Sequence, residues 1–265
     1  MTGPARVLLE RDPAHDGRIA HLVLNRPEAL NAIDNDLANA VCEACETLAH
    51  DQSIWVVIVR GNGDRAFCAG ADVKLRLGFS DEQWWTQRTL FRRMFALVRA
   101  VPQPMIAAVH GYALGGGAEI AMLADFIVAA DDAVFGLTET HLGIIPGGGG
   151  TQNLPRLVGR NRAKELIYCA RRFSAAEAER FGLVNRVVPR ADLVGTATAI
   201  AREIMANGPL AVRLTKRAID AGADLPFDEG LEREEEAYRR AIVSHDRREG
   251  IAAFNAKRAP EFTGT

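Results

Sequence analysis

Short apolar runs separated by polar turns predict a core of buried strands. Residues 54–59, 105–109 and 126–129 are continuous apolar segments, as expected for parallel strands that are buried on both faces. Residues 19–24 alternate more loosely and end at a turn containing Asn25 and Pro27, and residues 185–188 form a last short apolar run. The pattern therefore predicts an α/β fold with a mainly parallel sheet.

Helical periodicity lies between these runs. Residues 35–49 carry apolar side chains at helical spacing, and Ser80 with Gln83 forms a capping box before a segment that extends to about residue 100. Gly115–Gly117 leads into an apolar helix ending near Leu123, and a second capping box stands at Ser174 and Glu177. Strands therefore alternate with helices over most of the chain.

From Ala191 onward only helical patterns remain, over residues 192–206, 210–222 and 228–244. No linker or repeat interrupts the sequence before them. We therefore expect an α/β core over residues 1–190 that carries the functional site. A C-terminal helical region over residues 191–265 would complete the same functional unit.

Composition and charge narrow the functional class. The 265 residues are 48% hydrophobic with a formal net charge of −2, which is typical of a globular protein and argues against a nucleic-acid-binding surface. Four cysteines are too few for a disulfide framework, and the mixed charges of the first 18 residues resemble no targeting segment. The apolar tract of residues 105–130 contains charged residues, so it is expected to form buried core rather than a membrane span. These features predict a cytoplasmic protein.

Three possible sites are weak. Gly61–Ala66 matches a dinucleotide-binding spacing, but no helix pattern begins inside it. Cys42 and Cys45 form a single pair within a predicted helix, so packed thiols are favoured over a metal or redox site. His110 and His141 belong to no metal-binding motif and are interpreted as core or loop residues.

Glu119 is the most informative residue, because it stands in an apolar helix with almost no polar neighbours in the sequence. An ionised carboxylate is expensive to bury alone, so Glu119 is either paired structurally or kept for chemistry with a raised pKa. The glycines before it would let a backbone approach a ligand and leave helical N–H groups free for an oxyanion. Glu139 precedes a second glycine cluster at 147–150, and a solvated loop acid is the simpler interpretation of that residue.

Taken together, these segments resemble the enoyl-CoA hydratase/isomerase (crotonase) superfamily. Residues 66–74, 104–119 and 135–152 resemble its first oxyanion-hole loop, its signature strand–turn–helix and its second catalytic loop. Residues 25–31 and 246–250 extend the likeness to most of the chain. The resemblance implies a spiral of repeated ββα units with a C-terminal helical trimerisation region, and a homotrimer or a dimer of trimers.

The same resemblance implies acyl-CoA substrates, no metal and no cofactor other than the CoA carried by the substrate. Glu119 and Glu139 match the two catalytic glutamates of hydratases, and the N–H groups of Ala71 and Gly116 match the oxyanion hole. By position, the substrate and CoA contacts would be these oxyanion residues together with Ala29, Ala69, Asp72, Val73, Lys74 and Leu114. Retention of both glutamates favours hydration of a 2-enoyl-CoA over isomerisation or dehydration on the same fold.

Within the superfamily, residues 137–152, 163–167 and 208–213 are similar to the methylglutaconyl-CoA hydratase branch. Some members of that branch bind RNA through a lysine-rich helix, but residues 35–51 contain no Lys or Arg. We therefore expect no nucleic-acid partner and no membrane partner, and a non-catalytic binding protein is the remote alternative.

The acyl group is the least determined feature. The acyl tail should lie along residues 75–95, where Trp84, Arg88 and Phe91 share one helical face and Trp85 and Arg92 share the neighbouring one. The sequence does not decide whether arginine or aromatic side chains face the tail, and the simpler interpretation is that the aromatics pack in the core or between subunits while the arginines are solvated. The arginines are Arg76, Arg88, Arg92 and Arg93, and the aromatics include Trp84, Trp85 and Phe91. We expect a short-to-medium unsaturated chain, with the methylglutaconyl group as the alternative.

Overall fold

The computed structural model describes residues 4–265, so the first three residues of the predicted 1–190 core lie outside it. A six-stranded sheet has the order β1-β2-β3-β5-β7-β10, in which only β1 and β2 pair antiparallel. Its strands are β1 (Val7–Arg11), β2 (Ile19–Leu24), β3 (Val56–Gly61), β5 (Met105–Val109), β7 (Phe126–Ala130) and β10 (Arg186–Val188). The predicted strands are confirmed, although β3 begins two residues later than its apolar run.

A second, smaller sheet has the order β4-β6-β8-β9. Its strands are β4 (Ala66–Cys68), β6 (Tyr112–Leu114), β8 (Val134–Gly136) and β9 (Phe173–Ser174), and only β9 is antiparallel to its neighbour. The chain passes from the large sheet to the small one three times in succession, in β3–β4, β5–β6 and β7–β8, and helical segments follow each pair. This is the spiral of ββα units that the resemblance implied, and it brings the segments after β4, β6 and β8 to one side.

Helices cover both faces of the large sheet. One face packs against α1 (Asn35–His50) and α3 (Asp81–Arg99) through side chains such as Val57 and Ala107. The opposite face packs against α8 (Leu193–Met205) through alternate residues such as Ile58 and Ile106. This alternation explains why the strands are apolar throughout. Both capping boxes, at Ser80 and Ser174, are present as predicted.

Further helices surround the small sheet and its loops. They are α2 (Val73–Arg76), α4 (Gly116–Met122), α5 (Gly150–Val158), α6 (Arg160–Tyr168) and α7 (Ala175–Phe181), with the 3-10 helices Pro13–His15, Pro27–Ala29, Glu139–Leu142 and Arg190–Asp192. In the described residues, 4–265, no helix is long and apolar enough to cross a membrane. The 105–130 tract forms buried strands and the apolar helix α4, as expected.

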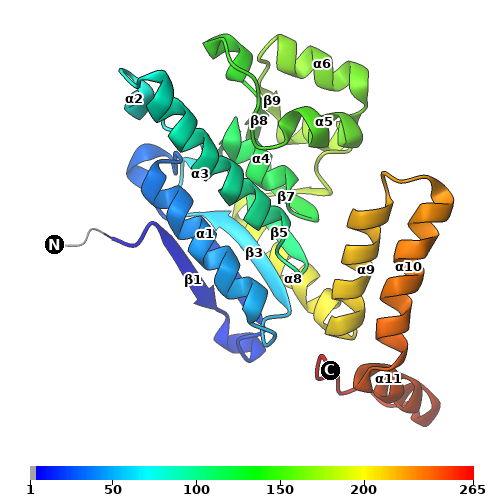
Figure 1. Ribbon diagram of the computed structural model, residues 1–265. Coiled ribbons are helices and arrows are strands. Elements are labelled where there is room, and N and C mark those ends of the chain that lie inside the picture. Colours follow the sequence, from blue (N-terminus) through cyan, green and yellow to red (C-terminus); the bar gives the residue numbers. More distant parts are fainter. Residues whose placement is uncertain (1–3) are drawn as a thin grey trace.

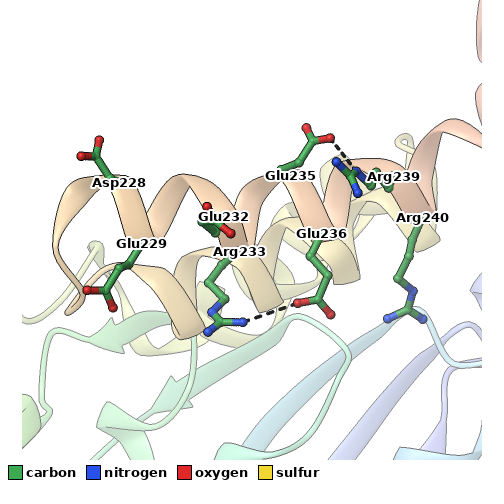
Figure 2. Close-up of a pocket in the computed structure, with 8 residues that line it drawn as sticks. All are labelled: Asp228, Glu229, Glu232, Arg233, Glu235, Glu236, Arg239 and Arg240. Carbon is green, nitrogen blue, oxygen red and sulfur yellow. Dashed lines mark hydrogen bonds and ion pairs between the residues drawn. The ribbon is translucent and has the colours of Figure 1, made fainter.

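The C-terminal region forms α9 (Pro209–Gly222), α10 (Phe227–Ile242) and α11 (His245–Ala256). Figure 1 shows α9 and α10 as a hairpin that projects from the body of the molecule, whereas α8 lies on the sheet. One face of α10 is charged, with Glu235 bonded to Arg239 at 2.7 Å and Glu236 3.8 Å from Arg233 (Figure 2). Several large apolar side chains on these helices are exposed, including Ile219, Phe227, Tyr238, Ile242 and Phe254.

Candidate active site

A cavity of about 530 Å³ opens where the segments after β4, β6 and β8 meet α3. Both predicted glutamates and both predicted oxyanion residues line it. The other walls are formed by side chains of α3 and by the loop of residues 144–148. The structure thus brings together four residues that lie up to 68 positions apart in the sequence, from 71 to 139.

Two backbone N–H groups at the cavity wall are available to an oxygen atom. Gly116 is the first residue of α4, so no carbonyl within that helix can accept from its N–H. Ala71 forms a bridge with Ile33, but the N–H groups used there belong to Ile33 and Asp72. A Cβ atom built on Gly116 would lie 3.9 Å from the Ala71 nitrogen, so the two groups are neighbours.

Glycine is required where the two oxyanion loops meet. A Cβ atom on Gly117 would lie 2.0 Å from the carbonyl oxygen of Cys68, so main chain packs directly on main chain. Gly70 has φ +91°, and a Cβ there would lie 2.7 Å from the Leu114 oxygen. The glycines therefore fix the distance between the loops that carry Ala71 and Gly116.

Glu119 is buried, and its carboxylate is held by backbone donors. Its Oε1 atom accepts from the N–H of Gly148 at 2.6 Å and from the N–H of Gly150 at 2.8 Å. Burial raises the pKa of Glu119, and these N–H groups and the charge of Arg88 oppose that rise. Glu119 thus has features of both interpretations left open by the sequence, since its carboxylate is hydrogen-bonded to the glycine loop and its pKa is raised by burial in the cavity wall.

Glu139 is half-buried at the start of the 3-10 helix Glu139–Leu142 and is not a solvated loop acid. Its Oε2 atom is buried and has no hydrogen-bond partner among the described residues. Burial and the neighbouring charge of Glu119 raise the pKa of Glu139 to about 7. The two carboxyl groups therefore differ in their environments, because the glycine loop donates two N–H groups to Glu119, whereas the backbone hydrogen bond that lowers the pKa of Glu139 comes from its own N–H.

The structure resolves which side chains of α3 face the cavity. Arg88 and the aromatic residues Trp84, Phe91 and Phe95 line it, with Trp85 at its rim, and Arg76 joins them from the end of α2. The other two arginines of this segment, Arg92 and Arg93, are exposed. Arginine and aromatic side chains thus share the wall instead of excluding one another.

The predicted substrate and CoA contacts divide into two groups. Ala69 and Val73 line the cavity with Ala71 and Gly116, whereas Ala29, Asp72, Lys74 and Leu114 lie outside its wall. Asp72 accepts hydrogen bonds from Arg26 at 2.7 Å and from the N–H groups at the start of α2. These contacts give Asp72 a role in positioning the segment after β4 that carries Ala71.

The weak motifs have structural positions. Gly61 ends β3 and Ala66 begins β4, so no helix starts in the dinucleotide-like segment. Cys42 and Cys45 are buried in α1. His110 and His141 lie outside the cavity wall. Within residues 4–265 no three His, Cys, Asp or Glu side chains are grouped to hold a metal ion.

Comparison with known proteins is consistent with this geometry. The family model for enoyl-CoA hydratase/isomerase matches residues 15–265. The chain belongs to this family. A crotonyl-CoA hydratase of Syntrophomonas wolfei is 40% identical over 97% of each chain. An enoyl-CoA hydratase domain-containing protein 2, mitochondrial, of Mus musculus is 43% identical over 93% of this chain and 84% of its own.

Solved structures agree on the fold of this family. The crystal structure of an enoyl-CoA hydratase from Bacillus anthracis superposes with a TM-score of 0.91 at 45% identity, covering 94% of this chain and 96% of that one. The chain is therefore an enzyme with the crotonase fold.

The sequence did not predict that the glycine loop would hold Glu119 or that Arg76 and Arg88 would line the cavity. The only local signal for the loop was the glycine cluster at 147–150.

Proposed function

We propose that the enzyme adds water across the 2,3 double bond of a 2-enoyl-CoA thioester. The observation that carries the proposal is the pair Glu119 and Glu139 in one cavity with the free N–H groups of Ala71 and Gly116. The crotonyl-CoA hydratase named above, 40% identical to this chain, supports the same reaction.

The backbone donors stabilise the charge that hydration creates. When the oxygen of water attacks C3, the electrons of the double bond move toward the thioester and its oxygen becomes negative. Ala71 and Gly116 donate to that oxygen, and the N-terminal end of α4 adds a favourable dipole. The enolate then collapses as C2 takes a proton, so one water is added without any change in the oxidation state of the protein.

The two glutamates divide the proton transfers. Glu119 receives two N–H donors that favour its ionised form, so it is suited to take a proton from water. Glu139 has a pKa of about 7 and no donors to its buried oxygen, so it is suited to hold the proton delivered to C2. Because the two carboxyl groups titrate as a coupled pair, these roles refer to one charge state of the pair. At the start of the proposed reaction Glu119 is ionised and Glu139 is protonated.

The wider setting follows the family resemblance. The substrate brings its own CoA, and proton transfer with an oxyanion hole requires no metal or redox cofactor. We expect a homotrimer or a dimer of trimers built from the C-terminal helices, located in the cytoplasm, with neither nucleic acid nor membrane as a partner.

The test is a panel of 2-enoyl-CoA esters from four to ten carbons, with and without a branch at C3. Hydration removes the conjugated thioester absorbance and adds the mass of one water to the product. We expect both signals with at least one ester. If 3-enoyl-CoA esters are converted to 2-enoyl esters while no 2-enoyl ester is hydrated, the enzyme is an isomerase and the proposal is wrong.

A further inference from the structure

Two arginines face the cavity without a carboxylate partner. Arg76 and Arg88 line the same space as Glu119 and Glu139. Within residues 4–265, neither guanidinium lies within 4.0 Å of a carboxylate oxygen, whereas Arg93 on the outer face of α3 is 2.6 Å from Glu46. Both cavity arginines are partly buried. Their positive charge is therefore not balanced by a direct ion pair.

Within residues 4–265, Arg76 makes one side-chain hydrogen bond, through its Nε atom, and lies close to an aromatic ring. This atom donates to Oε1 of the buried Gln87 at 2.7 Å, and Gln87 in turn donates to Oδ1 of Asn35 at 2.8 Å. The guanidinium lies 4.5 Å from the ring centroid of Trp84. These contacts orient the plane of the guanidinium and leave its two terminal nitrogens for another acceptor.

Arg88 lies beside the loop that holds Glu119, and its charge acts on the pKa values of both Arg76 and Glu119. Its guanidinium carbon would be 3.4 Å from a Cβ atom built on Gly147, next to the residue that donates to Glu119. Burial and the charge of Arg88 lower the pKa of Arg76. Two like charges this close destabilise each other, and a bound anion would offset that repulsion.

The arginines lie where the end of an acyl chain would reach. The ring of Phe95 would be 3.4 Å from a Cβ atom on Gly116, so Phe95 marks the oxyanion end of the cavity. Phe91 and Arg88 follow on the same face of α3, at one and two helical turns from Phe95. A chain that runs from the oxyanion hole along these residues passes an aromatic wall and then meets a guanidinium.

We propose that Arg76 and Arg88 bind a carboxylate at the far end of the acyl group, so that the preferred substrate is the CoA thioester of an unsaturated dicarboxylic acid. The inference deepens the proposed function and rests on it. Arginine is suited to this task because its planar fork donates two parallel hydrogen bonds to a carboxylate.

A binding experiment tests this separately from catalysis. Saturated thioesters cannot be hydrated, so glutaryl-CoA and pentanoyl-CoA, which have acyl chains of five carbons, are titrated by calorimetry. We expect glutaryl-CoA to bind at least about tenfold more tightly than pentanoyl-CoA, because its far carboxylate would accept charge-assisted hydrogen bonds from the arginines. In Arg76→Gln and Arg88→Gln the ratio of the two dissociation constants should fall toward one.

The control variant is Arg92→Gln, because Arg92 is on α3 like Arg88 but is exposed and lies outside the cavity wall. It should retain the ratio of the wild-type protein. A wild-type ratio near one overturns the inference. So does a cavity variant that weakens both esters equally, since its arginine would then act on CoA itself.

Turnover separates this inference from the proposed function. Glutaconyl-CoA, the 2,3-unsaturated dicarboxylic ester, should show a kcat/KM at least about tenfold above that of 2-pentenoyl-CoA. Hydration of 2-pentenoyl-CoA with equal or greater efficiency would overturn the carboxylate site and leave the hydratase standing. Failure to hydrate any enoyl ester, with tighter binding of glutaryl-CoA retained, would overturn the hydratase and leave the carboxylate site standing.

Discussion

Glu119 and Glu139 share one cavity, but within residues 4–265 only Glu119 is anchored by backbone donors of another segment, the N–H groups of Gly148 and Gly150. Glu139 places a buried oxygen near the same space with no hydrogen-bond partner in the described chain. The pair is therefore asymmetric before any substrate is bound. This asymmetry is the basis for assigning two different protons to two residues of the same type.

Replacing either glutamate should lower turnover while preserving the fold. In the proposed mechanism each glutamate transfers a proton, so kcat for the best enoyl-CoA should fall by about 10²–10⁴ in Glu119→Gln and in Glu139→Gln. The assay is paired with circular dichroism to establish that the variants are folded. A variant with wild-type kcat would remove that residue from the mechanism.

The stability of the protein should depend on the titration of Glu139. The pKa of Glu139 is raised from 4.5, its ordinary value, to about 7 in the folded state. Between pH 4.5 and pH 7 the folded protein therefore keeps a proton that the unfolded chain releases. The stabilisation is complete below about pH 4.5 and is lost as pH rises through 7. Relative to Glu139→Gln, the wild-type protein should lose roughly 1–3 kcal/mol of unfolding free energy over that window.

Urea unfolding of both proteins at pH 5 and pH 8 measures this difference. The gap between them should widen in favour of Glu139→Gln at the higher pH. A gap that is the same at both pH values would show that Glu139 titrates normally in the folded protein. The rate of hydration should decline as pH rises through about 7, because the proposed mechanism starts from the protonated form of Glu139.

The oxyanion hole is tested at the first residue of α4. Gly116→Pro deletes the N–H donor at a helix position that tolerates proline, and its kcat should fall by about 10²–10³. Gly116→Ala is the matched control, since it keeps the N–H but adds a Cβ atom 3.2 Å from Ile33. If both variants lose the same activity, the effect is steric. Ala71→Ser, which keeps its N–H, should also be mild.

Arg26 should be important for stability. Its side chain contacts Asp34 at 3.2 Å and Asp72 at 2.7 Å, and both carboxylates are largely buried. Arg26→Met leaves Asp72 without a cationic partner and Asp34 with Arg6 alone, at 3.5 Å, so the unfolding free energy should fall by about 3 kcal/mol. Arg93→Met breaks an exposed ion pair with Glu46 and should change the unfolding free energy by about 1 kcal/mol or less. Denaturant titration of both variants compares the two, and equal losses would refute a special role for Arg26.

Assembly should bury the exposed apolar side chains of the C-terminal helices. Phe254 is 84% exposed and Phe227 is 79% exposed, which is unfavourable for a free surface. Light scattering at micromolar concentration should give three or six times the 28.8 kDa chain mass. A monomer would contradict the expectation, and Phe254→Glu should shift the wild-type assembly toward smaller species.

The sequence was most informative where single residues stood out against their surroundings. Glu119 in an apolar helix and the two glycine clusters located the cavity, and the buried strands followed from continuous apolar runs. The strands β1, β4, β6, β8 and β9 were not predicted from the apolar pattern. All of them except β1 have only two or three residues, which is too few for a periodic pattern, and β10 was recognised as part of a longer apolar run at 185–188. The helix α11 also lies beyond the predicted segments.

The orientation of α3 could not be predicted, because its arginines and tryptophans occupy neighbouring faces with similar spacing. Tertiary packing decides it, since burial of Phe91, Met94 and Phe95 turns Arg88 toward the cavity. The contact between the Glu119 carboxylate and the Gly148 N–H is also tertiary and has no local sequence signal. The division at residue 191 stays a prediction, although α8 packs on the sheet of the core.

The packing of Gly117 on the Cys68 carbonyl has a consequence for altering this enzyme. The spacing of the Ala71 and Gly116 donors is set by main chain against main chain, so any side chain at position 117 would separate the loops. Phe95 packs against Gly116, and Arg88 lies beside the loop that holds Glu119, so these two positions of α3 belong with the chemistry. Mutational libraries are therefore best confined to the far part of the wall, at Arg76 and Trp84, where the acids that are accepted could change while the donors keep their spacing.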